Sequence, residues 1–192
     1  MKTKAEILLS VPQRVFTVDD LAILWQIPDR SKLWESIKYY VRTKRLHSIQ
    51  RGVYAISEDY SPFEAGVKLF PPAYASFITA LAHHGVMFQY SSEIHLMAQA
   101  SKRLEIGGQI FVYHQLKNEV LLNQQGIDKV DNYWIAGLER AICDTSYLVP
   151  NFVFEYLGNV DFQKLELIAK IYNNKALEKR IEQIISLTKE DR

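Results

Sequence analysis

Basic side chains are concentrated in one short part of the 192-residue chain. Residues 1–51 contain ten Lys/Arg and five Asp/Glu, a net charge of +5, whereas the remaining residues carry −4. Between residues 30 and 51 one acid, Glu35, stands among seven bases: Arg30, Lys32, Lys38, Arg42, Lys44, Arg45 and Arg51. Lysine and arginine at this density neutralise phosphates, so the segment is expected to contact an anionic partner. On charge alone, a solvated basic surface is the alternative.

Histidine and acidic side chains offer little metal chemistry. His83 and His84 are adjacent, and neighbours on a helix point about 100° apart, so the pair cannot chelate one ion as an i, i+4 pair would. Glu93 and His95 share one face of a predicted strand, but no third ligand follows at a recognisable spacing. We therefore predict no metal site and no cofactor.

A charged cluster surrounds the single cysteine, Cys143. Arg140 and Asp144 lie one helical turn apart and are expected to form an ion pair, and Glu139 lies one turn before Cys143. A nucleophilic cysteine needs a base or a cation beside it, and a buried structural thiol is the favoured interpretation. No catalytic residue is predicted and the protein is not expected to be an enzyme. A metal-dependent nuclease that uses Glu139 or Asp144 is the alternative.

Three short helices are predicted before residue 45. The first spans about Lys4–Ser10, and the second begins after Thr17, an N-cap that Asp20 can answer, and ends before Pro28. The third runs from Lys32 to about Lys44 with Ser31 as its cap. Its apolar residues recur at helical spacing and form one stripe: Leu33, Ile37, Tyr40 and Val41.

The other side of the third helix carries cations and hydrogen-bonding groups, which suits a helix in the major groove of DNA. Two strands, Leu46–Gln50 and Val53–Ile56, then flank a tight turn at Arg51 and Gly52. Three helices followed by a basic hairpin predict a winged helix-turn-helix. The predicted DNA-binding residues are Lys32, Lys38, Tyr39, Arg42, Lys44, Arg45 and Arg51. A winged helix used for protein contacts is the alternative.

The remaining sequence predicts a second domain. We expect an α+β protein in which a winged helix-turn-helix, residues 1–58, precedes a mixed α/β domain, residues 61–192. A polar junction with Pro62 separates them. The expected elements are helices over 62–70, 73–84, 135–148, 161–172 and 175–187 and strands over 93–97, 104–106 and 109–113.

Composition predicts a cytoplasmic protein. A lone cysteine cannot form an internal disulfide, and no apolar run approaches the roughly 18 residues of a spanning helix, so no membrane partner is expected. The last helix places Leu177, Ile181, Ile184 and Ile185 on one side. This stripe packs against its own domain or forms the seam of a homodimer on DNA, and the first alternative is favoured.

Several motifs together resemble the AbiEi family, the antitoxin and transcriptional regulator of type IV toxin–antitoxin (abortive infection) systems. The resemblance covers most of the chain, and order and spacing carry it rather than one motif. The matching segments are residues 16–22 (FTVDDLA), 51–55 (RGVYA), 71–76 (PPAYAS), 80–81, 84–85, the Gly107-Gly108 hairpin with 111–114 (FVYH), and 138–144 (LERAICD) with 147–148.

The resemblance implies a repressor that binds inverted repeats in its own promoter and opposes a nucleotidyltransferase-like toxin through its C-terminal domain. It does not imply a stable complex with that toxin. The chain is shorter than the family pattern after residue 148. A protein-binding antitoxin or adaptor, in which the winged helix makes protein contacts, is the alternative function.

Overall fold

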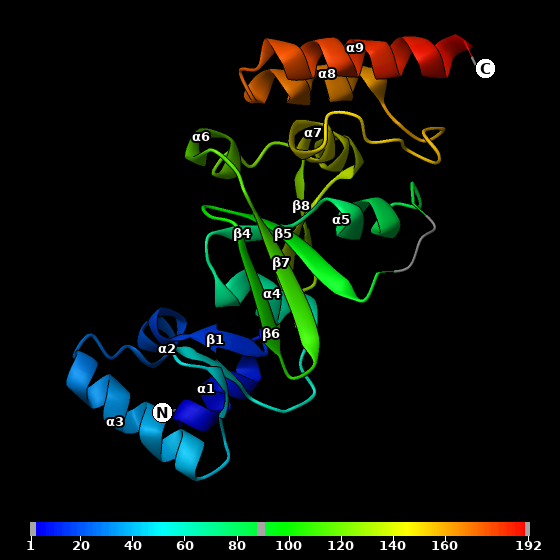
Figure 1. Ribbon diagram of the computed structural model, residues 1–192. Coiled ribbons are helices and arrows are strands. Elements are labelled where there is room, and N and C mark those ends of the chain that lie inside the picture. Colours follow the sequence, from blue (N-terminus) through cyan, green and yellow to red (C-terminus); the bar gives the residue numbers. More distant parts are fainter. Residues whose placement is uncertain (1–2, 88–90, 191–192) are drawn as a thin grey trace. The chain divides into compact units, whose positions relative to one another are not determined.

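The computed structural model describes residues 3–87 and 91–190 and has a mixed α+β fold with two separate β-sheets (Figure 1). This confirms the predicted α+β class. The chain divides into two compact units, residues 1–71 and residues 72–192.

The N-terminal unit begins with three helices, α1 (Lys4–Ser10), α2 (Val18–Trp25) and α3 (Arg30–Arg42). The Thr17 hydroxyl accepts a hydrogen bond from the Asp20 amide, and the Asp20 carboxylate accepts one from the Thr17 amide, so the predicted cap of α2 is confirmed. The sequence predicted Ser31 as the N-cap of α3, and this prediction is wrong. Asp29 is the N-cap, because its carboxylate accepts hydrogen bonds from the backbone amides of Ser31 and Lys32.

A three-stranded antiparallel sheet completes this part of the unit. Its strands are β1 (Val15–Thr17), β2 (His47–Gln50) and β3 (Val53–Ala55), in the order β1-β3-β2. The predicted hairpin is present, and Gly52 at its turn has a φ of +88°, a conformation that glycine adopts without strain. Strand β1 was not predicted, because three residues carry no periodicity and the strand exists only by pairing with β3.

Helix α4 (Pro62–Leu69) also belongs to the N-terminal unit, which therefore extends to residue 71 and not only to residue 58. The buried carboxylate of Glu64 accepts hydrogen bonds from the amides of Arg14 (2.9 Å) and Val15 (3.1 Å) at the start of β1. The Lys68 ammonium forms an ion pair with Asp20 at 2.8 Å. These contacts join residues about 50 positions apart, so the sequence alone places α4 with the wrong neighbour.

One apolar core holds α1, α2, α3 and the sheet together. Leu33 and Ile37 of α3 are at most 1% exposed, as the predicted stripe requires. The cluster contains Leu8, Phe16, Leu21, Trp25, Leu33, Ile37, Tyr40, Leu46 and Tyr54. Because α3 uses this stripe for packing, its opposite side is left to solvent.

The C-terminal unit is built on a six-stranded mixed sheet with the order β6-β7-β5-β4-β9-β8 (Figure 1). The strand pairs β5–β7 and β4–β9 are parallel, and the other neighbours are antiparallel. The strands are β4 (Ala73–Ala75), β5 (Glu93–Ala98), β6 (Lys102–Ile106), β7 (Gln109–Gln115), β8 (Ile127–Val130) and β9 (Tyr133–Ala136).

The helices of this unit are α5 (Ile78–His83), α6 (Asn118–Leu121), α7 (Leu138–Leu148), α8 (Phe162–Ile171) and α9 (Lys175–Glu190). Helix α7 contacts strand β9 on one side and helices α8 and α9 on the other, and α8 and α9 run side by side (Figure 1). Of the predicted stripe of α9, Leu177, Ile181 and Ile185 are buried within the unit and Ile184 is half-buried. This stripe therefore serves the unit's own packing, the favoured interpretation, and is not an open dimer seam.

Two sequence predictions in the C-terminal unit are wrong. Residues 73–84 do not form one helix, because Ala73–Ala75 form the strand β4 inside the sheet and α5 begins only at Ile78. Residues 133–136 form strand β9, so the helix expected from about residue 135 begins at Leu138. In both places pairing with distant strands overrides local helix propensity.

Candidate nucleic-acid interface

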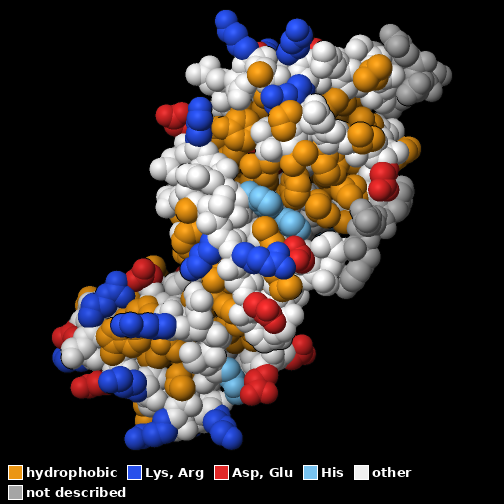
Figure 2. All heavy atoms as spheres, in the orientation of Figure 1, with side chains coloured by type: hydrophobic (Ala, Val, Ile, Leu, Met, Phe, Trp, Pro, Cys, Tyr) orange, Lys and Arg blue, Asp and Glu red, His pale blue; other side chains and the backbone are white. Residues whose placement is uncertain are grey.

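All seven residues predicted to bind DNA are exposed in the N-terminal unit: Lys32, Lys38, Tyr39, Arg42, Lys44, Arg45 and Arg51. Four of them project from α3, two follow its C-terminus, and Arg51 lies at the β2–β3 turn. In Figure 2, Lys and Arg side chains are gathered over the unit that holds α1–α3.

The structure brings Lys38 and Arg51 together. Both line a shallow depression of about 430 Å³ that also includes Ser31, Trp34 and Glu35. Ser31, Trp34, Glu35 and Lys38 are spaced at i, i+3, i+4 and i+7 along α3; Ser31, Glu35 and Lys38 lie away from the core stripe, and Trp34 lies at its edge. Two structural elements therefore converge on one basic concave surface.

Lys32, Tyr39 and Arg42 lie elsewhere along the exposed side of α3. The Arg42 guanidinium lies 5.8 Å from the centre of the Tyr39 ring, a cation–π distance, and both residues are exposed. At the end of the helix Lys44 has a φ of +56°, and Arg45 lies 5.8 Å from the Tyr40 ring. These residues extend the basic surface along α3 beyond the depression.

Sequence reasoning missed Trp34 as a surface residue. Trp34 is 37% exposed and is not part of the apolar cluster of this unit. The signal was available, because Trp34 follows Leu33 by one position, about 100° round the helix, and so lies at the edge of the core stripe next to the half-buried Val41. The wall of the depression consequently includes an indole among charged groups.

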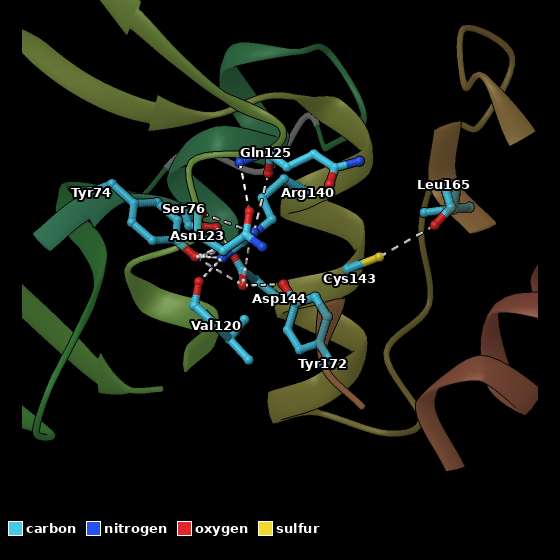
Figure 3. A network of polar contacts seen from close by, with 10 residues as sticks. All are labelled: Tyr74, Ser76, Val120, Asn123, Gln125, Arg140, Cys143, Asp144, Leu165 and Tyr172. Atoms are coloured by element: carbon cyan, nitrogen blue, oxygen red, sulfur yellow. Dashed lines mark hydrogen bonds and ion pairs between the residues drawn. The ribbon is translucent and has the colours of Figure 1, made fainter. Parts of the chain in front are cut away.

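The other predicted cluster, on α7, is a buried polar network and not an open site (Figure 3). Arg140 and Asp144 are both 0% exposed, and the Nε–Oδ1 distance is 3.6 Å, which confirms the predicted ion pair. Both Asp144 oxygens accept hydrogen bonds, from the hydroxyls of Tyr74, Ser76 and Tyr172. The Asp144 carboxylate thus accepts hydrogen bonds from Tyr74 in β4, from Ser76 directly after β4, and from Tyr172 at the end of α8.

Arg140 completes this network from the other side. Its guanidinium donates to the Tyr74 hydroxyl and to the backbone carbonyls of Val120, Asn123 and Gln125, and it lies 5.4 Å from the ring centres of Tyr74 and Tyr172. Burial by itself lowers the pKa of Arg140, but Tyr172, Asp144 and Tyr74 together raise it. Burial raises the pKa of Asp144, and Arg140 and the hydroxyl donors oppose that rise. Such an arrangement joins distant segments of the unit.

Cys143 and Glu139 have structural partners as well. The buried Cys143 thiol lies 3.8 Å from the Leu165 carbonyl, and burial raises its pKa well above the ordinary value, which opposes thiolate formation. This agrees with the structural interpretation of the thiol. The Glu139 carboxylate pairs with Lys164 at 2.8 Å and accepts from the Asp161 amide.

Two histidines of the C-terminal sheet form a pair that the sequence did not suggest. His95 on β5 and His114 on β7 are stacked at 8°, with His95 Nδ1 2.9 Å from His114 Nε2, and Phe77 packs against both rings. Burial is the main cause that lowers the pKa of His95 to about 4; His114 and Arg103 lower it further, and Glu93 opposes the shift. Burial also lowers the pKa of His114. Both rings are therefore neutral in the folded protein near pH 7.

This pair predicts acid lability. The unfolded chain binds protons at these histidines below about pH 6.5 and the folded chain does not, so stability is full above that pH and falls as the pH approaches 4. We expect His95 to account for a loss of about 2 kcal/mol, discounted for its partial contact with solvent. Urea unfolding between pH 7 and 4 measures this. The variant His95→Gln should show a flatter pH profile, and an unchanged slope would contradict the prediction.

Within the described ranges, 3–87 and 91–190, no group of three or more His, Cys, Asp or Glu side chains is arranged to hold a metal ion. His84 instead lies with Nε2 2.9 Å from the Ala136 carbonyl, and Glu93 pairs with Arg103. No helix in the same ranges is both long and apolar enough to cross a membrane.

No family model and no curated protein matches the chain. Among solved structures it is similar to the crystal structure of the RV2827C protein from Mycobacterium tuberculosis, at 12% sequence identity and a TM-score of 0.49, over 95% of this chain and 74% of that one.

Proposed function

We propose that the N-terminal unit is a winged helix-turn-helix that binds double-stranded DNA, and that the protein is a transcriptional repressor. Helix α3 acts as the recognition helix and the β2–β3 hairpin as the wing. The observation that carries the proposal is the convergence of Lys38 on α3 and Arg51 at the hairpin turn on one exposed basic depression. A helix presented beside a cationic turn fits a groove flanked by phosphates.

Charge distribution supports this interpretation further. The exposed side of α3 and the residues after it carry cations with Glu35 as the one acid of residues 30–51. The Arg30–Asp19 pair at the start of α3 is exposed and worth little in stability, so Arg30 is available to a phosphate as well. Net charge of this kind attracts a polyanion and makes binding depend on salt.

The resemblance to AbiEi antitoxins suggests which DNA the protein binds and which genes it regulates. We infer that the DNA is an inverted repeat in the chain's own promoter, that binding represses a toxin–antitoxin operon, and that the C-terminal unit opposes the toxin. Two copies on the two half-sites would follow the symmetry of the repeat. Since the apolar stripe of α9 is used inside the unit, a dimer contact would have to use another surface.

The test is a fluorescence-anisotropy titration of the full chain against its own upstream region at two salt concentrations, with scrambled duplex as control. The proposal requires binding that prefers the upstream region and weakens steeply with salt. Equal affinity for the scrambled duplex would remove the repressor function.

The exposed apolar residues of the C-terminal unit favour a second candidate, a protein-binding antitoxin or adaptor. Val153 is 83% exposed, Leu187 62%, Leu122 57% and Leu167 56%. Figure 2 shows apolar side chains gathered over the surface of this unit. Apolar side chains that gather into one exposed patch, rather than standing singly, are typical of protein contacts. Co-purification with the product of the neighbouring gene, unchanged by loss of DNA binding, would support this candidate.

The role of Arg42 can be tested separately. Because it stands beside Tyr39 near the C-terminal end of α3, we expect it to contact a phosphate. Arg42→Ala should then lower the affinity for the operator and for the scrambled duplex by the same factor, and it should reduce the slope of log affinity against log salt by about 1. A loss of about 1–3 kcal/mol confined to the operator would instead make Arg42 a base reader.

A further inference from the structure

Trp34 is the one large apolar side chain in the depression that α3 shares with the hairpin turn. It lies between Ser31 and Lys38 along the helix and is 37% exposed, although the unit has a closed apolar core nearby. An indole carries a large apolar surface, and leaving part of it in water forgoes the stabilisation that burial would provide. Exposure alone does not distinguish Trp34, since Ile23 and Leu9 of the same unit are more exposed, but Trp34 lies in the wall of the depression that Lys38 and Arg51 also line.

Glu35 indicates which part of a DNA duplex would face this depression. A carboxylate against the phosphate backbone would be repelled, whereas a carboxylate at the groove floor can accept a hydrogen bond from the amino group of cytosine. Lys38 from α3 and Arg51 from the hairpin turn line the same depression and supply the positive charge that offsets Glu35 and attracts the phosphates. The depression is thus suited to base edges, with phosphates at its margin.

The major groove presents one apolar group that an indole can select, the methyl on C5 of a pyrimidine. We propose that Trp34 reads such a 5-methyl group and is a specificity-determining residue of the interface. This rests on the proposed function, because it requires α3 to enter the major groove. The methyl belongs to thymine or to 5-methylcytosine, and the experiment separates these two sources.

The experiment uses the full chain and the duplex from its upstream region, with the protected segment first located by footprinting. Each thymine in that segment is replaced in turn by uracil, which removes one methyl group and changes nothing else. Loss of a buried methyl contact corresponds to about a fourfold loss of affinity. We expect the wild-type chain to lose about this factor at one position in each half-site.

Trp34→Ala should bind thymine and uracil duplexes equally at that position, and Trp34→Phe should retain part of the difference. Lys38→Ala is the matched control on the same helix. It should lower the affinity for the thymine and uracil duplexes by the same factor and so leave the methyl effect intact. Circular dichroism melting of each variant checks folding, and the uracil series on the wild-type chain needs no variant at all.

The second arm places cytosine or 5-methylcytosine at the sensitive position. A gain of about fourfold for 5-methylcytosine over cytosine supports recognition of the methyl itself, and tighter binding than thymine would identify the methylated base as the natural target. The inference is overturned if uracil costs the wild-type chain nothing at every position, or if Trp34→Ala keeps the full uracil effect. Failure of the wild-type chain to prefer its upstream region would instead overturn the proposed function.

Discussion

Asp144→Ala is expected to destabilise the C-terminal unit by about 3–5 kcal/mol, enough to unfold much of it at moderate temperature. The substitution leaves the Arg140 guanidinium buried without its carboxylate, and the hydroxyls of Tyr74, Ser76 and Tyr172 lose their common acceptor. A buried donor without an acceptor keeps its desolvation penalty. Urea denaturation followed by tryptophan fluorescence measures the change.

The matched control is an exposed ion pair of the same unit, Arg103–Glu93 at 2.7 Å, in which the Arg103 side chain is 58% exposed. Arg103→Ala should cost less than about 1 kcal/mol, because water screens the charges and replaces the contact. The double variant Arg140→Met with Asp144→Leu should recover part of the stability lost in Asp144→Ala, since it removes both buried charges. A cost below about 1 kcal/mol for Asp144→Ala would show that the network contributes little.

Substitution of Asp144 also addresses the enzyme alternative. A hydrolytic carboxylate must reach a metal ion or water, and Asp144 is 0% exposed with both oxygens occupied by hydroxyl donors. This geometry favours a structural role. A divalent-metal-dependent activity that Asp144→Asn abolishes without loss of stability would contradict that conclusion.

Removing both Lys38 and Arg51 is expected to have the largest effect on the affinity for DNA. For Lys38→Ala combined with Arg51→Ala we expect the salt slope to fall by about 2 and the affinity to fall by about 30- to 100-fold at low salt, because each cation releases one condensed counterion on binding. Both side chains are exposed, so folding should be unaffected. Anisotropy titrations over a range of salt concentrations give the slope directly.

Two controls make this result specific. Lys129→Ala on β8 removes an exposed cation from the C-terminal unit and should leave the slope unchanged. Each single variant should lower the slope by about 1, and a combined effect equal to either alone would indicate that only one of the two residues contacts the duplex. An unchanged slope in the double variant would remove the depression from the interface.

The sequence by itself determined the local elements of this protein and the sides they expose. The Thr17–Asp20 cap, the apolar stripe of α3 and the turn at Gly52 depend on residues within four positions of one another, so their chemistry is visible in the sequence. The exposure of the seven predicted DNA-binding residues follows from the same period, since a helix that buries one stripe leaves its other side in water.

Tertiary structure decided everything that depends on pairing across long separations. Strand β4 lies inside the sheet although its sequence favours a helix, and β1 exists only because β3 binds it. Asp144 accepts hydrogen bonds from the hydroxyls of Tyr74 and Ser76, which lie 70 and 68 positions before it, and Trp34 of α3 and Arg51 of the hairpin turn line one depression. Local propensities differ by less than about 1 kcal/mol per residue, and burial of a single side chain exceeds that, so packing prevails wherever the two conflict.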